Sequence, residues 1–330
     1  MCRLVRNGRV FVRTVCAAWG GMGGFSWGLF VLHGAVWLEV RRRRRQQRQM
    51  GERLNILYCG NDKVEDGIVI SVLSLLKNIR EPLHIYILTM ELSVGKKVYF
   101  PVSEHFASYL DRMVKKISRE HCVRFIDISE LFKSELPAAN LDTRFTPYCM
   151  LRLFADRIPE MPDKILYLDT DVVCRKDCSE LYHQDITDCE LAGVLDYYGR
   201  WFFRRDIWRL DYLNSGVLLM NLVLIRQTGL LKRCRELCAR KKMFMPDQSA
   251  INKEAVRKKL LPRCYNEQRK LREDTVLQHF STTFRFFPLF RIQTVKPWQI
   301  DQVHDKLKLH EYDDLLQEYM RLLPEIRRFT

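Results

Sequence analysis

The stretch KILYLDTDVVCRKD, residues 164–177, combines the pattern of a buried strand with two closely spaced carboxylates. Four apolar residues, 165–168, run into Asp169 and Asp171, which Thr170 separates, and two valines follow. In an extended chain, residues i and i+2 point to the same face, about 6.5–7 Å apart. Two unpaired carboxylates near the interior are costly, and a bound divalent cation removes that cost. The pattern indicates a metal site at a strand end, and an ordinary exposed strand end is the simpler alternative.

Around this stretch, segments typical of buried strands alternate with segments typical of helices. The predicted strands are 54–59, 83–88, 123–127, 164–177, 190–196, 215–221 and 275–281. The predicted helices are 67–78, 106–117, one capped by Thr146 with Pro147 in its first turn, 231–242, 247–256 and 304–323. This order predicts one Rossmann-like mixed, mostly parallel sheet flanked by helices. Ligands of such sheets lie beyond the carboxyl ends of the strands, where the pair of aspartates is expected.

The net charge of +15 comes mostly from the first fifty residues. Residues 1–50 hold ten arginines and one acid, Glu39, which give +9 and leave +6 for the other 280 residues. The body is therefore only mildly basic, and its charge does not indicate nucleic-acid binding. The eleven cysteines form no C-x-x-C motif and are interpreted as free, mostly buried thiols in a reducing cytoplasm.

Residues 14–38 are uncharged and long enough to span a bilayer, but six glycines between Arg13 and Glu39 keep them a weak transmembrane candidate. The basic segment 41–48 would keep the following body cytoplasmic, at the inner face of the membrane. The alternative is that residues 1–49 are an upstream or disordered extension, because Met50 directly precedes the first predicted strand.

Further polar residues stand at strand and helix ends. Asp196 ends the segment AGVLD, and Asn214 and Ser215 precede a buried strand, where small polar residues suit close approach to a polyhydroxyl ligand. Asp247 and Gln248 begin a predicted helix, where they could contact a ligand or cap the helix. His279 lies among apolar residues, where a single histidine is more often structural. Lys296 precedes Pro297 and Trp298, and a single lysine is more often solvated.

In this order, the motifs LDTD, AGVLD, LNSGVLLMN, PDQSAIN and a late His followed by KPW resemble the family-eight retaining glycosyltransferases. That family includes bacterial lipopolysaccharide galactosyl- and glucosyltransferases and glycogenins, and the resemblance covers about residues 54–300. It implies a nucleotide-diphospho-sugar transferase fold of the glycosyltransferase A type. It also implies transfer of glucose or galactose from a UDP-sugar to a glycan or glycolipid acceptor of lipopolysaccharide type, with Mn²⁺ (or Mg²⁺).

The resemblance assigns roles to individual residues. Asp169, Asp171 and His279 would bind the metal, a mixed carboxylate and imidazole set that suits Mn²⁺ better than Mg²⁺. Lys296 would neutralise the departing diphosphate. The donor would further contact Tyr58, Cys59, Asn61, Asp62, Arg152, Asp169, Thr170, Asn214 and Ser215. Asp196, Asp247 and Gln248 would act at the sugar, the last two closest to the anomeric carbon.

The chain departs from the family pattern at three places. Asn61 stands where relatives often carry Asp, with Asp62 beside it. Met150 stands where relatives often carry Arg, and Arg152 is the expected substitute. His279 and Lys296 are 17 residues apart instead of forming a tight His-Gly-Lys loop. The inserted segment FRFFPLF, 284–290, is predicted either to contribute to the acceptor site or surface docking, or to pack in the core.

Two other functions compete. The stretch LDTDVV also fits the haloacid-dehalogenase phosphohydrolase motif, in which Asp169 would be the nucleophile and Asp171 the general acid. A catalytically inactive carbohydrate-binding protein on the same fold is the third possibility. The predicted organisation is an N-terminal extension (1–50), a catalytic domain (51–300) and a C-terminal helical tail (301–330), with peripheral membrane association as a further expectation.

Overall fold

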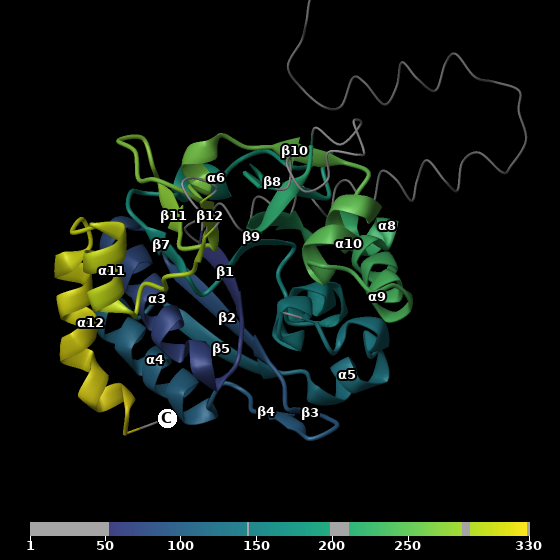
Figure 1. The fold of residues 1–330 in the computed structure, drawn as a ribbon, viewed down its shortest axis with the longest axis horizontal. Helices are drawn as coiled ribbons and strands as arrows, with labels where there is room; N and C mark the ends of the chain where they lie inside the picture. The colour runs from purple at the N-terminus through teal and green to yellow at the C-terminus, as the bar shows by residue number, and fades with distance from the viewer. Residues whose placement is uncertain (1–52, 144, 199–210, 286–290, 329–330) are drawn as a thin grey trace, which may run out of the picture. The chain divides into compact units, whose positions relative to one another are not determined.

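The computed structural model describes residues 53–143, 145–198, 211–285 and 291–328, so the predictions for residues 1–50 lie outside the described residues. A seven-stranded sheet forms the centre of this part of the chain (Figure 1). Its strands, in spatial order, are β10 (Lys258–Leu260), β8 (Leu191–Leu195), β9 (Leu213–Asn221), β6 (Lys164–Leu168), β1 (Leu54–Cys59), β2 (Leu83–Thr89) and β5 (Cys122–Asp127).

The sheet is mixed and mostly parallel, as the sequence predicts. Strands β1, β2, β5 and β6 run parallel, and β10 runs parallel to β8. Only β9 runs against its neighbours within this sheet, because it pairs antiparallel with both β6 and β8. The reversal of β9 brings its amino end to the edge where β6 and β8 have their carboxyl ends.

Helices cover both faces of the sheet. The buried apolar residues between the sheet and these helices form two clusters. One cluster joins the sheet to α3 (Glu65–Asn78), α4 (Glu104–Ile117), α6 (Ser179–Tyr182), α11 (Ile300–Leu307) and α12 (Asp313–Ile326). The other joins it to α5 (Ser129–Ser134), α8 (Leu222–Thr228), α9 (Leu230–Arg240), α10 (Pro246–Glu254) and the 3-10 helix η3 (Pro147–Arg157). Alternate apolar residues of β1 divide between the clusters, which is why this strand is apolar on both faces except at Asn55.

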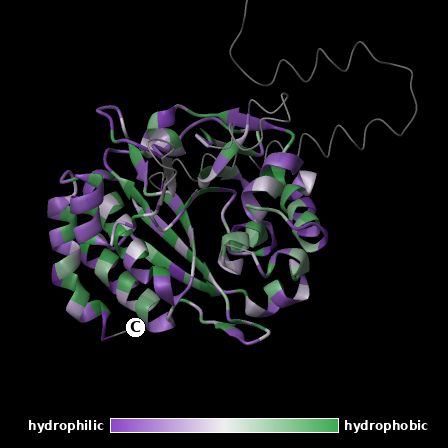
Figure 2. Ribbon diagram, viewed as in Figure 1, coloured by the Kyte–Doolittle hydropathy of each residue, from purple (hydrophilic) through white to green (hydrophobic). Residues whose placement is uncertain are grey.

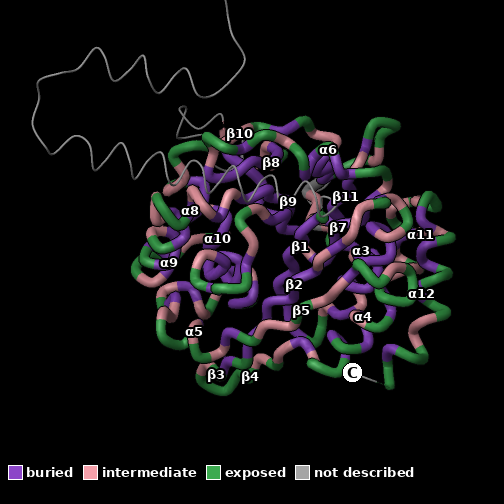
Figure 3. The backbone as a smooth tube through the Cα atoms, turned by 180° about the vertical axis from the view of Figure 1, so that it is seen from behind, coloured by how far each residue is buried: buried purple, intermediate pink, exposed green. Residues whose placement is uncertain are grey.

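Figure 2 shows the apolar strands between helices whose outer faces are polar, and Figure 3 shows the same strands as buried. Smaller elements complete the described part of the chain. They are the paired strands β3 (Leu92–Val94) and β4 (Lys97–Tyr99), β7 (Val172–Cys174) and β11 (Leu277–His279), β12 (Thr283–Arg285) and β13 (Arg291–Gln293), and the 3-10 helices η1 (Asp62–Val64), η2 (Ala138–Asn140) and η4 (Arg263–Tyr265). None of the described helices is both long and apolar enough to cross a membrane.

Four local predictions were wrong. The segment 164–177 is two strands, β6 and β7, and the two aspartates lie in a turn between them rather than on an extended strand. The C-terminal helix is broken into α11 and α12 at Lys308, whose φ of 52° ends α11. Ile117 is 59% exposed although it continues the apolar spacing of α4. Thr146 makes no side-chain cap, and the helix after Pro147 is of the 3-10 type.

Candidate functional site

A cavity of about 380 Å³ opens where β6 and β8 end and β9 begins. The register of β6 and β9 pairs Leu168 with Val217, and the backbone amide of Asp169 donates to the carbonyl of Gly216 at 2.8 Å. Most predicted site residues line the cavity: Cys59, Asn61, Arg152, Asp169, Thr170, Asp171, Asp196, Asn214, Ser215, Asp247, Gln248, His279 and Lys296. One sheet edge thus collects residues that lie up to 237 positions apart in the sequence.

Two predicted donor residues do not line this cavity. Tyr58 points into the core, where its hydroxyl forms a 2.8 Å hydrogen bond with Ser71. Asp62 is exposed, and its carboxylate accepts from the backbone amide of Lys63. Neither residue lines the cavity, whereas Asn61 does.

Asp169, Asp171 and His279 form a cluster that could hold a metal ion, with one ligand atom from each within 4.8 Å of the others. His279 Nε2 lies 3.2 Å from Asp171 Oδ1 and 3.6 Å from Asp169 Oδ2. The antiparallel pairing of β7 with β11 sets His279 opposite Val172, directly beside the aspartate turn. Asn266 Oδ1 lies 3.2 Å from the other ring nitrogen, Nδ1, so it orients the imidazole with Nε2 toward the carboxylates.

The charges that line the cavity are unbalanced. Four carboxylates face two permanent cations, and these groups are Asp169, Asp171, Asp196 and Asp247 against Arg152 and Lys296. With His279 neutral, the lining carries two excess negative charges. A divalent cation would balance them, and the donor set of carboxylate oxygens and one imidazole is chemically suited to such an ion.

Lys296 forms an ion pair with Asp171. Burial acts to raise the pKa of Asp171, but the Lys296 ammonium and the His279 imidazole outweigh it and hold that pKa well below its usual range. Burial likewise acts to lower the pKa of His279, and the Asp171 carboxylate more than offsets it, so the His279 pKa is raised. The Asp171 carboxylate thus favours the charged forms of both His279 and Lys296, because it raises the pKa of each.

Arg152 connects the cluster of Asp169, Asp171 and His279 to the side of the cavity that α10 lines. Its Nη2 donates to Asp169 Oδ1 at 2.9 Å, and its Nε lies 3.4 Å from Asp247 Oδ2. Its guanidinium also lies 3.9 Å from the ring centroid of Tyr167, whose hydroxyl donates to the same Asp169 oxygen at 2.6 Å. The structure thus places Arg152, two positions beyond Met150, on the cavity wall, whereas Met150 is buried in the core.

Hydrogen-bonded polar side chains form the side of the cavity that α10 lines. Gln248 Nε2 donates to Asp196 Oδ2 at 3.0 Å, and Asn214 Nδ2 donates to the same oxygen at 2.9 Å. Ser215 Oγ donates to Asp247 Oδ2 at 3.1 Å. These residues come from β9, α10 and the end of β8, and their mutual bonds fix the side chains before any ligand binds.

Several lining residues were missed by the sequence analysis. They include Tyr148, Tyr167, Phe145, Phe244, Thr282 and Trp298. Asn266, which orients His279, follows η4 in a region without a predicted element. Trp298 belongs to the quoted KPW motif and Tyr167 to the quoted stretch 164–177, so both had a signal in the sequence. No sequence signal marked Phe145 and Phe244, because a single phenylalanine in a loop resembles a core residue. In the structure their ring centroids are 6.0 Å apart.

Gly216 leaves no room for a side chain at the metal-ligand cluster. A Cβ there would lie 2.2 Å from His279 Cε1 and 2.9 Å from Asp169 Oδ2. We expect Gly216→Ala to displace His279 and lower metal-dependent turnover by about 10- to 100-fold, the usual effect of disturbing a ligand's support. Steady-state kinetics at varied Mn²⁺ concentration measure it.

Gly193→Ala is the matched control, because it also adds a methyl group to a strand of the same sheet. Its nearest neighbour would be a Leu218 side-chain carbon at 3.0 Å, which can shift. If Gly216→Ala kept both its turnover and its Mn²⁺ dependence, His279 would not be held against the aspartates as described.

The sequence matches the profile of Glycosyl transferase family 8 over residues 55–299. This range contains every residue of the cavity lining. It leaves the phosphohydrolase interpretation of the two aspartates without support.

Two kinds of curated relative are similar to the chain. Lipopolysaccharide 1,2-glucosyltransferase of Escherichia coli is 23% identical over 316 residues, which covers 82% of this chain and 86% of the relative. Glycosyltransferase GlyA of Streptococcus pneumoniae serotype 4 is 35% identical over 105 residues, but the chain covers only 14% of its length. The chain thus spans most of the first relative and a small part of the second.

Solved structures share the fold. The galactosyltransferase LgtC in complex with donor and acceptor sugar analogs matches with a TM-score of 0.55 at 17% identity, covering 80% of this chain and 96% of that one. The bifunctional glycosyltransferase WbbM matches with a TM-score of 0.62 at 16% identity, covering 85% and 52%. Both support the predicted glycosyltransferase A type of sheet.

Proposed function

Since this chain belongs to glycosyl transferase family 8 and is a glycosyltransferase, we propose that it moves a hexose, glucose or galactose, from a UDP-sugar to a glycan or glycolipid acceptor of lipopolysaccharide type. The observation that carries the proposal is the cluster of Asp169, Asp171 and His279 in a cavity with excess negative charge. The cavity volume of about 380 Å³ lies in the usual range for small-ligand sites.

Asp169, Asp171 and His279 would hold a divalent cation, for which Mn²⁺ fits the mixed oxygen and nitrogen donors best. Such an ion neutralises the negative charge that develops on a leaving diphosphate. Lys296 already touches Asp171 in the structure. Once a divalent cation compensates that carboxylate, the Lys296 ammonium is available to pair with a phosphate oxygen, which is the role proposed for it.

Asp196, Asp247 and Gln248 would bind the hydroxyl groups of the donor sugar. Each of them is fixed by a neighbour, so the pocket is ordered in advance and little side-chain entropy is lost on binding. We further propose retention of configuration by front-face attack, with the leaving phosphate helping to deprotonate the acceptor hydroxyl. Asp247 is already engaged by Arg152 and Ser215, which argues against its use as a covalent nucleophile.

The acceptor would enter past Phe145 and Phe244, which line the cavity and are 38% and 53% exposed. Exposed aromatic faces suit the apolar face of a sugar ring. The earlier prediction for the segment 284–290 is not tested, since residues 286–290 lie outside the described ones.

The proposed function is tested by incubating the full chain with UDP-glucose and UDP-galactose, with and without Mn²⁺. Mn²⁺-dependent release of UDP, with sugar appearing on an added glycan, is the expected result. Binding of sugar without any turnover would instead favour an inactive carbohydrate-binding protein. Phosphate release from phosphomonoesters, with none of UDP from UDP-sugars, would sink the proposal.

Mn²⁺ affinity is expected to rise with pH. His279 must be neutral to bind a metal, and Asp171 raises its pKa, so protons compete with the ion up to a higher pH than for an ordinary histidine. Affinity should therefore continue to increase with pH above about 6.5, where an ordinary histidine has already lost half of its protons. Isothermal titration at several pH values measures this, and His279→Asn should bind Mn²⁺ more weakly and with a flatter pH profile. An equally steep profile in that variant would remove His279 from the ligand set.

A further inference from the structure

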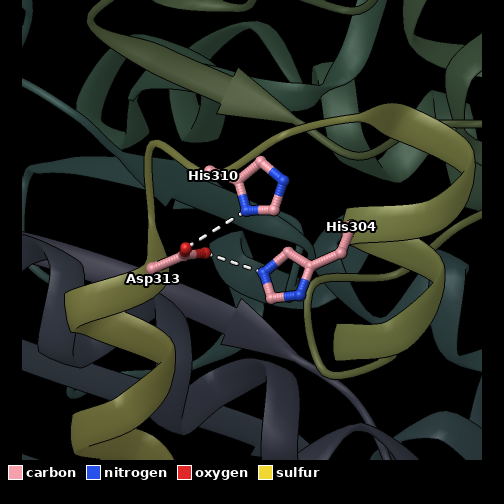
Figure 4. Close-up of side chains that lie close together, drawn as sticks. All are labelled: His304, His310 and Asp313. Carbon is pink, nitrogen blue, oxygen red and sulfur yellow. Dashed lines mark hydrogen bonds and ion pairs between the residues drawn. The ribbon is translucent and has the colours of Figure 1, made fainter.

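A second cluster of possible metal ligands lies at the junction of α11 and α12, away from the residues that line the cavity. It consists of His304 near the end of α11, His310 in the connection and Asp313 at the start of α12. Figure 4 shows both imidazoles directed at the two oxygens of the Asp313 carboxylate. His304 Nε2 lies 2.7 Å from Oδ1 and His310 Nδ1 lies 3.2 Å from Oδ2.

The backbone between the helices brings these side chains together. Lys308 adopts a left-handed conformation with φ of 52°, unusual for a residue other than glycine, and so reverses the chain immediately after α11. The imidazoles of His304 and His310 consequently stack, with ring centroids 4.6 Å apart and an interplanar angle of 20°. On the far side, α12 is tied to α3 by the ion pair between Lys77 and Asp314. The helix α11 is anchored by Val303, which is buried in the same apolar cluster as α12.

The donor set suits a transition metal better than it suits Mg²⁺ or Ca²⁺. One ligand atom from each of the three side chains lies within 4.8 Å of the others, so small rotations would bring all three onto one ion. Two imidazoles and one carboxylate are the ligands that Zn²⁺, Co²⁺ and Ni²⁺ accept readily. The site is also open, since the side chains of His304, Asp313 and His310 are 31%, 40% and 65% exposed.

Among the described residues, no lysine or arginine forms an ion pair with the Asp313 carboxylate, whereas Lys296 pairs with that of Asp171. The ion pairs of Asp313 with described residues are those with the two histidines. A metal ion at Asp313 would therefore have to displace only protons on the imidazole nitrogens and water.

We propose that His304, His310 and Asp313 bind one divalent transition-metal ion of the Zn²⁺ class and thereby fasten α11 to α12. The remaining coordination positions point to solvent and take water. The bound ion is structural: it closes the C-terminal helix pair on the body of the enzyme and takes no part in sugar transfer.

The test uses the full chain carrying Asp171→Asn, which weakens the cluster in the cavity, and titrates it with Zn²⁺ by calorimetry. One equivalent is expected to bind. Adding His310→Ala should weaken this binding at least about tenfold, because loss of an outer-sphere partner alone costs that much. Co²⁺ in place of Zn²⁺ should give visible absorption bands that the His310→Ala variant lacks.

His183→Ala is the matched control, because His183 is also a partly exposed histidine beside a carboxylate, 3.6 Å from Glu81. It should leave Zn²⁺ binding unchanged. Equal Zn²⁺ affinity with and without His310→Ala, or no binding to the parent chain, would overturn the proposal and leave only two histidine–carboxylate hydrogen bonds. The Asp313→Asn variant supplies an independent second comparison, and it should weaken Zn²⁺ to a similar extent as His310→Ala.

Discussion

Asp171→Asn is expected to lower Mn²⁺-dependent UDP release by about 10²- to 10³-fold or more, the effect of removing one strong electrostatic group from an active site. The substitution keeps the size of the side chain but removes the charge to which both His279 and Lys296 are bound. The metal would lose a carboxylate ligand, and Lys296 would lose the partner that positions it. The loss is measured as kcat with saturating donor, with circular dichroism to verify the fold.

The control for this prediction is Asp163→Asn. Asp163 precedes the same strand, β6, at its opposite end, and its carboxylate lies 4.0 Å from Arg226 at the surface. This variant should keep wild-type turnover. Full Mn²⁺-dependent activity in Asp171→Asn would show that the aspartate turn does not hold the metal.

Arg152→Met is expected to have the largest effect on stability. The guanidinium is 4% exposed and pairs with two carboxylates, on Asp169 and Asp247, and it donates to the carbonyl of Ser215. Methionine has a similar length, so packing on Tyr167 is largely kept while the charge is lost. Removing one partner of a buried ion pair costs about 3–5 kcal/mol, because the charge left behind is uncompensated. Urea unfolding measures the change, and turnover should fall as well.

Arg226→Met provides the comparison. Arg226 also donates to two backbone carbonyls, of Asp156 and Met161, but its side chain is 33% exposed and its carboxylate partner is distant. Its free energy of unfolding should change by less than about 1 kcal/mol. If Arg152→Met lowered the free energy of unfolding by as little as Arg226→Met, water would already screen the carboxylates of Asp169 and Asp247. Combining Arg152→Met with Asp247→Asn should recover part of the lost stability, since one of the two orphaned charges is then gone.

The aspartate turn shows how a correct site can rest on partly incorrect local geometry. From the sequence, Asp169 and Asp171 are predicted to lie on one face of an extended strand. In the structure they lie in a turn, and Asp169 accepts a backbone hydrogen bond from Val172 at 3.1 Å. Their identity and spacing were sufficient to suggest a cation, because charge and burial do not depend on the exact backbone path.

Lys296 shows the opposite case, in which sequence distance was misleading. It lies 17 residues after His279, yet both side chains reach Asp171. Strands β12 and β13 explain this, because they pair as a hairpin with Thr283 opposite Gln293 and return the chain to the cavity. Because the two ends of such a hairpin lie side by side, residues can be inserted between them while the flanking residues keep their positions. Its presence could not be inferred from a segment that was interpreted as an acceptor element or as core.

The strand and helix order, the buried strands and most polar residues at the sheet edge follow from the sequence alone, because they depend on local periodicity and on residue type. Which of those residues meet depends on the tertiary structure. The direction of β9 places Asn214 and Ser215 beside Asp169, the 3-10 helix η3 brings Arg152 to the cavity wall, and a left-handed Lys308 turns His310 back onto Asp313. Each of these contacts depends on pairing or packing between distant segments, or on a single backbone angle. None of these features produces a periodic pattern in the sequence.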